Sequence, residues 1–432
     1  MRIGLFTDTY RPSINGIVYT VESTKRYLEK LGHEVYVFCP GGSIRPGSLE
    51  EDDHTIRFPS VKGAFYDDYD TSLFFPPLVL SRIKELDLEV IHFFTPGQVG
   101  LMGVYAAHKT GAALVAQHCT DVYEFIEHYP RTLPGILALA ALLPLIFKTN
   151  MKDIRAIAEL YRPRRSRSAW GRDVIEKLVT MVYSKCDAVI ALSRKSQAQL
   201  QSWQREAHYK YEVSLLPNGV NAIPAATTQQ VTAFRQQWQI AEDDEVFGFV
   251  GRLGAEKNLA ILIPTIERVM HARPHARLLF VGDFEYREHL EALARGSSTA
   301  SRITFTGALP REQLGLAYGT LEVFVFPSLT DTQGWVLHEA AHAGLPIVLI
   351  DRQLSEVMVD GENGYFADNN ADDLAKVIST LLADGALRDR FGSRSKQLAA
   401  TFTEGRQIGK LTKLYERAIV AAVHKQQVRD EF

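Results

Sequence analysis

The sequence has few cysteines, little net charge and no long hydrophobic run. Only three of its 432 residues are cysteines (Cys39, Cys119 and Cys186), and no two of them form a CxxC pair. This argues against a disulfide framework and against a zinc site, and it fits a reducing cytoplasm. The formal net charge is −3, from 48 basic and 51 acidic residues. This balance gives no reason to expect nucleic acid as a partner.

The longest apolar run, Leu133 to Phe147, has 15 residues and contains two prolines. A membrane span needs about 20 residues, so we do not expect this run to cross a bilayer. Met1 leads directly into a strand-like segment without a basic and apolar leader. No signal peptide is therefore predicted, and we expect a cytoplasmic protein.

The usual nucleotide fingerprints are also missing. Gly42 to Ser48 has the glycine spacing of a phosphate loop but lacks its lysine. Gly97, Gly100 and Gly103 do not form a GxGxxG motif, and they are better explained by close packing of a helix on a sheet. These absences argue against a nucleoside triphosphatase and against a dehydrogenase.

The composition is that of a soluble globular protein, and the length favours two domains of about 200 residues each. Short apolar runs alternate with helical patterns in both halves, which is typical of parallel sheets covered by helices on both faces. The predicted strands are 2–7, 34–39, 90–94, 113–117, 187–192, 213–216, 246–250, 277–281, 303–306, 323–326 and 346–349. We therefore predict an α/β protein with two Rossmann-like domains.

The predicted domains are residues 1–217 and 242–406. The best linker candidate is 217–241, because it contains Asn-Gly, a proline and a polar TTQQ run. A last helix at about 407–423 could pack on either domain. Open parallel sheets bind ligands at the carboxyl ends of their strands, so two such sheets facing each other across a cleft could hold donor and acceptor separately.

The most informative segment is FPSLTDTQGWVLHEAAHAGLPIVL, residues 326–349. It predicts a strand, a glycine turn, a helix from about Trp335 to Ala343 and a further strand after Gly344. The first amides of such a helix point back to the carboxyl end of the strand, where an anion such as phosphate is favoured. The segment therefore predicts an anion-binding turn.

Two acids, Asp331 and Glu339, lie on either side of this turn. Carboxylates accept hydrogen bonds from sugar hydroxyls, so a nucleotide sugar would satisfy both the amides and the acids. The alternative is that Asp331 caps the helix and Glu339 is a solvated helical acid.

Two cations follow the strand at 246–250. In FVGRLGAEKN, Arg252 and Lys257 lie at a glycine turn beside the carboxyl edge of the sheet. Both could neutralise a diphosphate leaving group. The alternative is a pair of solvated surface charges.

Taken together, GRLGAEKN, FTGALPREQL, SLTDTQGWVLHEAAHAGLPIV and the opening IGLFTDTYRPSINGIVYTVESTKRYLEKLGHEVYVF resemble family 4 retaining glycosyltransferases of the GT-B fold. The resemblance covers nearly the whole chain. It implies that Arg252 and Lys257 bind the donor diphosphate, that Glu339 takes the ribose hydroxyls and that Asp331 holds the transferred sugar. Family members usually have Glu at the position of Asp331. Asp is one methylene group shorter, so the reach of its carboxylate and the choice of sugar are in question.

Further roles follow from the same resemblance. Gly16 matches a glycine whose backbone approaches the diphosphate, and His118 matches the active-site histidine near the sugar. A histidine at a strand end is more often a satisfied polar group. The remaining predicted donor-site residues are Gly282, Gly307, Thr332, Gln333, Gly334, Trp335, Val336 and Leu337, and the candidate acceptor residues are Asp8, Tyr10, Asn15 and Asp121.

No residue is an obvious covalent nucleophile, and the resemblance implies front-face attack in which the leaving phosphate takes the acceptor proton. Catalysis would then consist of positioning and charge neutralisation, without a metal or a resident cofactor.

The acceptor is predicted from the composition of residues 133–172 and from the subgroup of the family that the motifs resemble. Residues 148–172 hold eight Lys or Arg against two acids, next to the apolar run. This combination suits docking of 133–172 on an anionic membrane, and a core helix followed by a solvated loop is the alternative. TDTYRPSINGIV and the TQG turn look most like the subgroup that glucosylates diacylglycerol. We therefore expect a lipid acceptor at the inner membrane face.

Other functions would look similar in sequence. Within the family these are a phosphatidylinositol mannosyltransferase and an enzyme that builds polysaccharides. Outside it, a sugar-nucleotide-binding regulatory protein would release no nucleoside diphosphate, and an epimerase would turn over donor without acceptor. A phosphorylase would carry a late pyridoxal-binding lysine, and we identify none.

Overall fold

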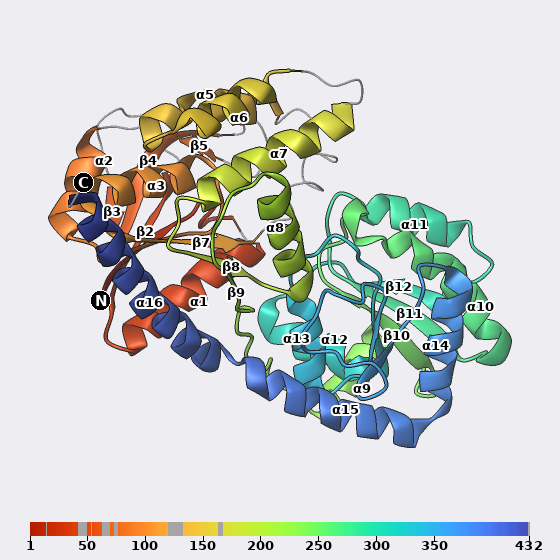
Figure 1. Cartoon of the computed structure of the whole chain (residues 1–432). Coiled ribbons are helices and arrows are strands. Elements are labelled where there is room, and N and C mark those ends of the chain that lie inside the picture. Colours follow the sequence, from red (N-terminus) through yellow and green to blue (C-terminus); the bar gives the residue numbers. More distant parts are fainter. Residues whose placement is uncertain are drawn as a thin grey trace. The chain divides into compact units, whose positions relative to one another are not determined.

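The computed structural model describes residues 1–13, 15–41, 50–52, 54–62, 70–72, 77–119, 133–162 and 167–430. The chain forms two compact units. The first comprises Met1–Asn218 and Glu404–Phe432, and the second comprises Gly219–Thr403 (Figure 1). The glycine-rich stretch Gly42 to Ser48 and the candidate acceptor residue Asp121 lie outside the described residues.

The sheet of the first unit has the order β3-β4-β2-β1-β6-β7-β8-β9, and β5 pairs with β4. Neighbouring strands are parallel from β4 to β9, whereas β3 and β5 are antiparallel to β4. The strands are β1 (Arg2–Phe6), β2 (Glu34–Gly41), β3 (Glu50–Asp52), β4 (Thr55–Lys62), β5 (Asp70–Ser72), β6 (Val90–Phe93), β7 (Ala113–His118), β8 (Ala188–Ala191) and β9 (Val213–Leu215).

Both faces of this sheet are covered, which is why its strands read as continuous apolar runs. One core lies between the sheet and α1 and α16, and the other lies between the sheet and α3, α5, α7 and α8. The helices are α1 (Gly16–Lys30), α2 (Pro77–Leu86), α3 (Gln98–Thr110), α5 (Leu133–Ile146), α6 (Met151–Leu160), α7 (Arg167–Tyr183), α8 (Arg194–Glu206) and α16 (Glu404–Asp430).

The last helix, α16, is longer than the predicted 407–423 and packs on the first unit beside α1 (Figure 1). The hydroxyl of Tyr415 lies 2.7 Å from Nδ1 of His92 on β6, and both side chains are fully buried. Ser23 on α1 donates a 2.7 Å hydrogen bond to Glu404, the first residue of α16. The chain therefore returns to its N-terminal unit after completing the second one.

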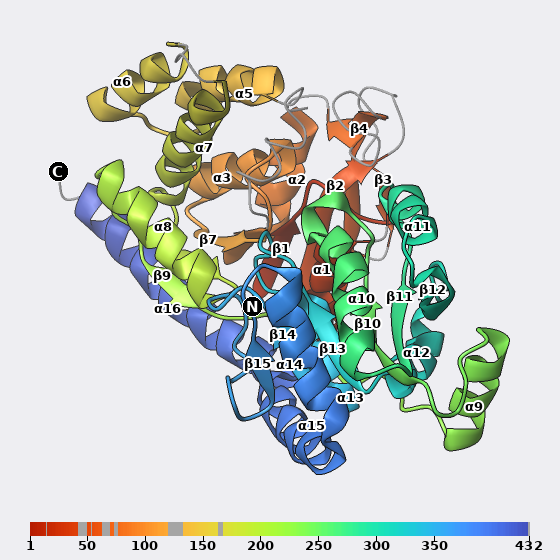
Figure 2. The ribbon, with the colours of Figure 1, turned by 90° about the vertical axis from the view of Figure 1, so that its right-hand side faces the viewer.

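The second unit has one parallel sheet with the order β12-β11-β10-β13-β14-β15. In Figure 2, α10 and α14 lie side by side against this sheet. The strands are β10 (Glu245–Val250), β11 (Ala276–Val281), β12 (Ile303–Phe305), β13 (Val323–Phe326), β14 (Ile347–Leu349) and β15 (Gly364–Phe366). The helices are α9 (Thr228–Gln237), α10 (Leu262–Ala272), α11 (Arg287–Arg295), α12 (Leu314–Thr320), α13 (Trp335–Ala343), α14 (Ala371–Ala383) and α15 (Gly385–Ala399).

The fold class is confirmed, and every predicted strand is present with ends shifted by two residues at most. The prediction missed β3, β4, β5 and β15. Strand β4 contains Pro59, which weakens a strand signal, and the other three strands are only three residues long.

The stretch predicted as a linker, 217–241, contains helix α9. Thr227 and Gln230 form a capping box at its start, and Phe234 is buried within the helix. The helix packs against α12 of the second unit. The polar TTQQ run is therefore the start of a helix rather than a flexible connection.

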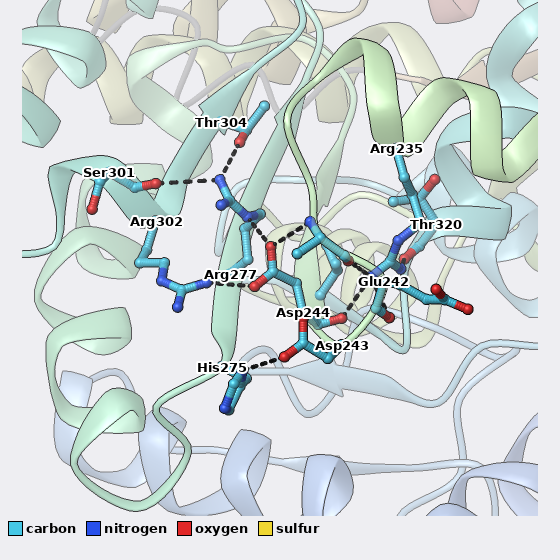
Figure 3. Close-up of polar contacts among 12 residues, drawn as sticks. Arg235, Glu242, Asp243, Asp244, His275, Arg277, Ser301, Arg302, Thr304 and Thr320 are labelled. Atoms are coloured by element: carbon cyan, nitrogen blue, oxygen red, sulfur yellow. Dashed lines mark hydrogen bonds and ion pairs between the residues drawn. The ribbon is translucent and has the colours of Figure 1, made fainter.

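At the amino ends of β10 and β11, a buried carboxylate is paired with two arginines. Figure 3 shows the guanidinium groups of Arg277 and Arg302 meeting the carboxylate of Asp244. Nε of Arg277 lies 2.7 Å from Oδ2, and the amide of Ala241 donates to the same oxygen at 2.8 Å. Asp244, Asp243 and His275 are close enough together to hold a metal ion. Because Asp244 is already paired with two cations, we interpret the group as a structural anchor.

This arrangement predicts a stability difference between two adjacent acids. The Asp244 side chain is 1% exposed, so Asp244→Asn leaves two arginines without their counter-charge, and we expect a loss of about 3 kcal/mol in the free energy of unfolding. The Asp243 side chain is 69% exposed and pairs only with His275, so Asp243→Asn should stay within about 0.5 kcal/mol of wild type. Urea unfolding followed by circular dichroism measures both, and equal midpoints would contradict the anchoring role.

The same pair gives a pH dependence. Burial acts to raise the pKa of Asp244, but the hydrogen bonds from Arg277 and the Ala241 amide and the charges of both arginines outweigh it, so the pKa is lowered from its usual 3.8. The stabilisation is therefore complete above that value and is lost as the pH falls through the lowered pKa of the folded state. Asp244→Asn should abolish this part of the acid sensitivity.

Candidate active site

Helix α13 follows β13 after the loop 327–334, as the sequence predicts. It spans Trp335–Ala343, preceded by Gly334 with φ 69° and followed by Gly344 with φ 83°. Both φ values lie in the left-handed region, where glycine is favoured. The first amides of a helix have no partner within it, so this end of α13 can receive an anion.

Three glycines bring the loops beyond β10, β11 and β12 into direct backbone contact. The amide of Gly251 donates to the carbonyl of Val281 at 2.9 Å, and the amide of Gly282 donates to that of Gly307 at 2.9 Å. A Cβ atom added at Gly282 would overlap the carbonyl oxygen of Gly251. Gly282 and Gly307, predicted as donor-site residues, therefore also have a structural role at this edge.

The two predicted cations lie at this same edge, and each is paired with a carboxylate. Nζ of Lys257 lies 2.6 Å from Oδ1 of Asp331. Arg252 contacts Oε1 of Glu256 at 2.6 Å and lies over the ring of Phe284, 4.3 Å from its centroid. The structure thus brings Arg252, Lys257 and Asp331 together, as the motif order implies.

Glu256 is part of this cluster and was not assigned a role from the sequence. Its carboxylate is also 3.9 Å from Nζ of Lys257. An acid adjacent to Lys257 in the AEKN motif was the available signal. The spacing of four residues from Arg252 is the one at which side chains meet on a helical turn.

Glu339 is buried, and each of its carboxylate oxygens accepts a hydrogen bond from a protein group. Its residue exposure is 3%, Arg311 donates to Oε1 at 2.9 Å, and the Tyr318 hydroxyl donates to Oε2 at 2.8 Å. Burial raises the pKa of Glu339, while the charge of Arg311 and the hydrogen bonds from Tyr318, Arg311 and Trp335 lower it. The alternative in which Glu339 is a solvated helical acid is therefore wrong.

Arg311 and Tyr318 are the partners that sequence reasoning missed. Arg311 belongs to the FTGALPREQL motif that carries the resemblance, but nothing in the motif indicates that it reaches α13. Asp331 does not cap α13 either, since the residue before the helix is Gly334 and no side chain caps it. Its Oδ1 is instead paired with Lys257.

The other predicted residues of the turn have different surroundings. The Leu337 side chain is fully buried in the core of the second unit, and its amide donates to the carbonyl of Gly334 at 2.9 Å. Gln333 is also buried, with Nε2 3.3 Å from Nε2 of His338. Thr332 is half-buried in the loop before the helix, and Trp335 and Val336 are half-buried in its first turn.

In the first unit, His118 is the last residue of β7 and is buried. Its Nδ1 lies 3.1 Å from the hydroxyl of Tyr183, and its ring packs edge-on against Tyr183 and Trp203. Burial lowers its pKa to about 4, against an opposing contribution from Gln199. The imidazole is therefore neutral near pH 7 and can accept or donate a hydrogen bond.

Two of the candidate acceptor residues hold the starts of helices. Asp8 is buried and accepts hydrogen bonds from the Val99 amide at 2.7 Å and from the Thr95 hydroxyl. Asn15 caps α1 by accepting from the amides of Ile17 and Val18, each at 3.0 Å. These contacts give both residues a structural role, and their role toward an acceptor stays a prediction.

The remaining two predicted residues of this unit are Tyr10 and Gly16. Tyr10 is half-buried under the Arg57 guanidinium, and burial together with the charge of Glu22 raises its pKa to about 12. Gly16 is the first residue of α1, and a Cβ atom added there would meet nothing within 4 Å. No packing contact among the described residues therefore requires glycine at position 16.

Among the described residues, no helix combines the length and the apolar character that crossing a membrane would need.

Comparisons with known proteins identify the family. The chain is 27% identical over 383 residues to the alpha-monoglucosyldiacylglycerol synthase of Acholeplasma laidlawii, covering 86% of this chain and 85% of that protein. It is 24% identical over 353 residues to a GDP-mannose-dependent alpha-mannosyltransferase of Corynebacterium glutamicum, covering 81% and 72%. The crystal structure of Anabaena HepE in complex with UDP superposes with a TM-score of 0.65 at 15% identity, covering 96% and 100%.

Two family profiles divide the chain between them. The profile "Glycosyltransferase Family 4" matches residues 14–222, and "Glycosyl transferases group 1" matches residues 230–398. With two parallel α/β sheets and structural neighbours of the GT-B fold, the chain belongs to the family 4, group 1 glycosyltransferases, a family of retaining hexosyltransferases.

Proposed function

We propose that this glycosyltransferase transfers glucose from a nucleoside-diphosphate sugar to a lipid acceptor, such as diacylglycerol, at the inner face of a membrane. The observation that carries the donor half is the cluster of Arg252, Lys257 and Asp331 within one sheet edge that also holds the start of α13. The similarity to a glucosyldiacylglycerol synthase supports the choice of sugar and acceptor.

In this proposal each side chain has a distinct task. Arg252 and Lys257 neutralise the diphosphate while its bond to the sugar breaks, and the amides at the start of α13 bind the same charge. Asp331 accepts hydrogen bonds from sugar hydroxyls, and Glu339 accepts them from the ribose. Arg311 and Tyr318 hold the Glu339 carboxylate in place, since each donates to one of its oxygens.

The chemistry needs no protein nucleophile. The acceptor hydroxyl attacks from the face that the diphosphate leaves, and a leaving-phosphate oxygen takes its proton. The contribution of the protein is then orientation and charge stabilisation, which we propose to operate without a metal.

The donor roles are tested by Lys257→Ala and Glu339→Gln. We expect each to lower turnover by at least about a hundredfold, because each removes a charged group that contacts the donor. Release of nucleoside diphosphate in the presence of donor and acceptor is the measurement, with thermal melting as the check on folding. A folded variant with near wild-type turnover would show that the residue is not part of the donor site.

The lipid acceptor is supported by an exposed apolar surface on α5 and α6. Both helices form an outer layer over α3 and α7 in the first unit (Figures 1 and 2). Leu143 and Ile146 of α5 are buried, which fits the alternative of a core helix. The opposite face of α5, however, is exposed. Of the nine large hydrophobic side chains exposed among the described residues, four lie between 145 and 161: Leu145, Met151, Ile154 and Tyr161.

Exposed cations accompany these apolar side chains in the sequence. Lys148, Lys152, Arg155 and Arg162 are exposed on α6 and in the segments on either side of it. The acids nearby are engaged: Asp153 is buried against Lys185 at 2.7 Å, and Glu159 pairs with Lys177 at 2.8 Å. An apolar surface bordered by unneutralised cations is suited to the headgroup region of an anionic bilayer.

The docking surface is tested with a double variant and a matched control. Leu145→Glu with Ile154→Glu should lower binding to anionic vesicles by tenfold or more, because it replaces side chains that are 71% and 47% exposed with charges of the wrong sign. Val420→Glu with Val423→Glu, on α16, changes side chains that are 71% and 48% exposed and should bind as wild type does. Cosedimentation with phosphatidylglycerol vesicles is the measurement. The proposed surface would be contradicted if both double variants lost vesicle binding equally, or if neither lost any.

The sequence also places Arg164, Arg165 and Arg167 in this basic region. Residues 164 and 165 lie outside the described residues, as does the side chain of Arg167. Neutralising all three is predicted to weaken vesicle binding in proportion to the lost charge, and unchanged binding would count against their part in it.

A second candidate is transfer of mannose from GDP-mannose, supported by the similarity to the mannosyltransferase. One assay separates the two. Uridine and guanosine donors are each supplied with diacylglycerol, with phosphatidylinositol and with polyprenyl phosphate, and the product is identified by mass. Formation of glucosyldiacylglycerol from a uridine donor supports the first proposal. A product from any other combination of donor and acceptor would contradict it and would identify the actual substrates.

A further inference from the structure

We propose that the donor binds at the carboxyl edge of the second sheet. The charged side chains at this edge balance each other before any ligand binds. Arg252 contacts Glu256 at 2.6 Å, and Lys257 contacts Asp331 at 2.6 Å and Glu256 at 3.9 Å. These two cations and two anions have no net charge together. A diphosphate that binds to both cations must therefore face two carboxylates that already contact them.

The two acids differ in what else they can do. Asp331 precedes the start of α13 and is proposed to bind sugar hydroxyls, so its contact with Lys257 fits a role in the donor complex. Glu256 has no such second role. It lies in the 3₁₀ turn Ala255–Lys257, four residues after Arg252, and its carboxylate is close to both cations.

The local backbone keeps the Glu256 carboxylate in this place. The hydroxyl of Thr330 donates to the carbonyl of Glu256 at 3.2 Å, and the amide of Lys257 donates to the carbonyl of Gly254 at 3.1 Å. A Cβ atom added at Gly254 would overlap the carboxylate of Glu256. Glycine at 254 thus leaves room for the acid, whose side chain is only 16% exposed.

We propose that Glu256 competes with the diphosphate for Arg252 and Lys257, and that it thereby favours release of the nucleoside diphosphate product. This inference rests on the proposed donor role of the two cations. The carboxylate occupies Arg252 when the site is empty and repels a bound diphosphate when it is full. Loss of the sugar leaves a terminal phosphate with one more ionisable oxygen, whose pKa is near 6, so the product carries more negative charge than the donor at pH 7. Repulsion by Glu256 therefore acts more strongly on the product than on the donor.

The test compares binding of product and donor in Glu256→Gln, which removes the charge and keeps the size of the side chain. The ligands are uridine or guanosine diphosphate, whichever the wild-type chain binds, and the corresponding nucleotide sugar. We expect the Kd of the nucleoside diphosphate to fall about tenfold, which corresponds to about 1.4 kcal/mol, and that of the nucleotide sugar to fall less. Isothermal titration calorimetry measures both, and product inhibition of turnover should strengthen in parallel.

Glu291→Gln is the matched control. Glu291 lies on α11 in the same unit and pairs with Arg287 at 2.7 Å, so the variant removes the same charge without contacting Arg252 or Lys257. Both Kd values should stay at the wild-type level. Thermal melting checks that each variant is folded, and Glu256→Ala provides a second removal of the charge.

Each outcome has one meaning. Unchanged or weaker binding of the nucleoside diphosphate by Glu256→Gln overturns the proposal, since the acid would then have no effect or would orient Arg252 for binding. If Glu256→Gln lowers the Kd of the nucleoside diphosphate and of the nucleotide sugar by the same factor, the role of Glu256 in product release is overturned. If the wild-type chain binds neither ligand, the donor site itself is wrong, and that failure is distinct from the failure of the role assigned to Glu256.

Discussion

The carboxyl edge of the second sheet, where we propose that the donor binds, depends on how closely the backbone loops beyond β10 and β11 approach each other. Gly251 has φ 147° and Gly282 has φ 140°, and no side chain fits at Gly282 because the carbonyl of Gly251 occupies its place. In a parallel sheet the carboxyl ends of all strands lie at one edge. The contact between Gly251 and Gly282 therefore fixes the position from which the loop after β10 starts, at residue 252. The placement of Arg252 and Lys257 follows from it, as does that of the Glu256 turn between them.

Charge pairing then sets the properties of the edge. Lys257 is tied to Asp331, Arg252 to Glu256, and the buried Glu339 to Arg311 and Tyr318. Asp331 is one methylene shorter than the glutamate usual in the family, and its oxygen lies 2.6 Å from Lys257. The group proposed to hold the sugar is thus fixed by the cation proposed to hold the diphosphate.

The first unit shows how one helix can satisfy two environments. In α5 the buried Leu143 and Ile146 join the core, while Leu145, which lies between them in the sequence, is 71% exposed. A helical period places neighbouring residues on different faces, so an almost wholly apolar helix always leaves apolar side chains outside when only one side is covered. The cations of α6 and its flanks give that outer face a polar border, which is the basis for proposing a membrane as its partner.

The sequence by itself determined the two parallel sheets, the bounds of α13, and the position of Arg252 and Lys257 just after a buried strand. These are local properties, because apolar periodicity and glycine positions encode strands, turns and helix ends within a few residues. It could not show that Glu339 is held by Arg311 and Tyr318, that Asp8 and Asn15 secure the starts of α3 and α1, or that α9 packs against α12. Such contacts join residues from separate elements, and only the packing of the folded units decides which side chains meet.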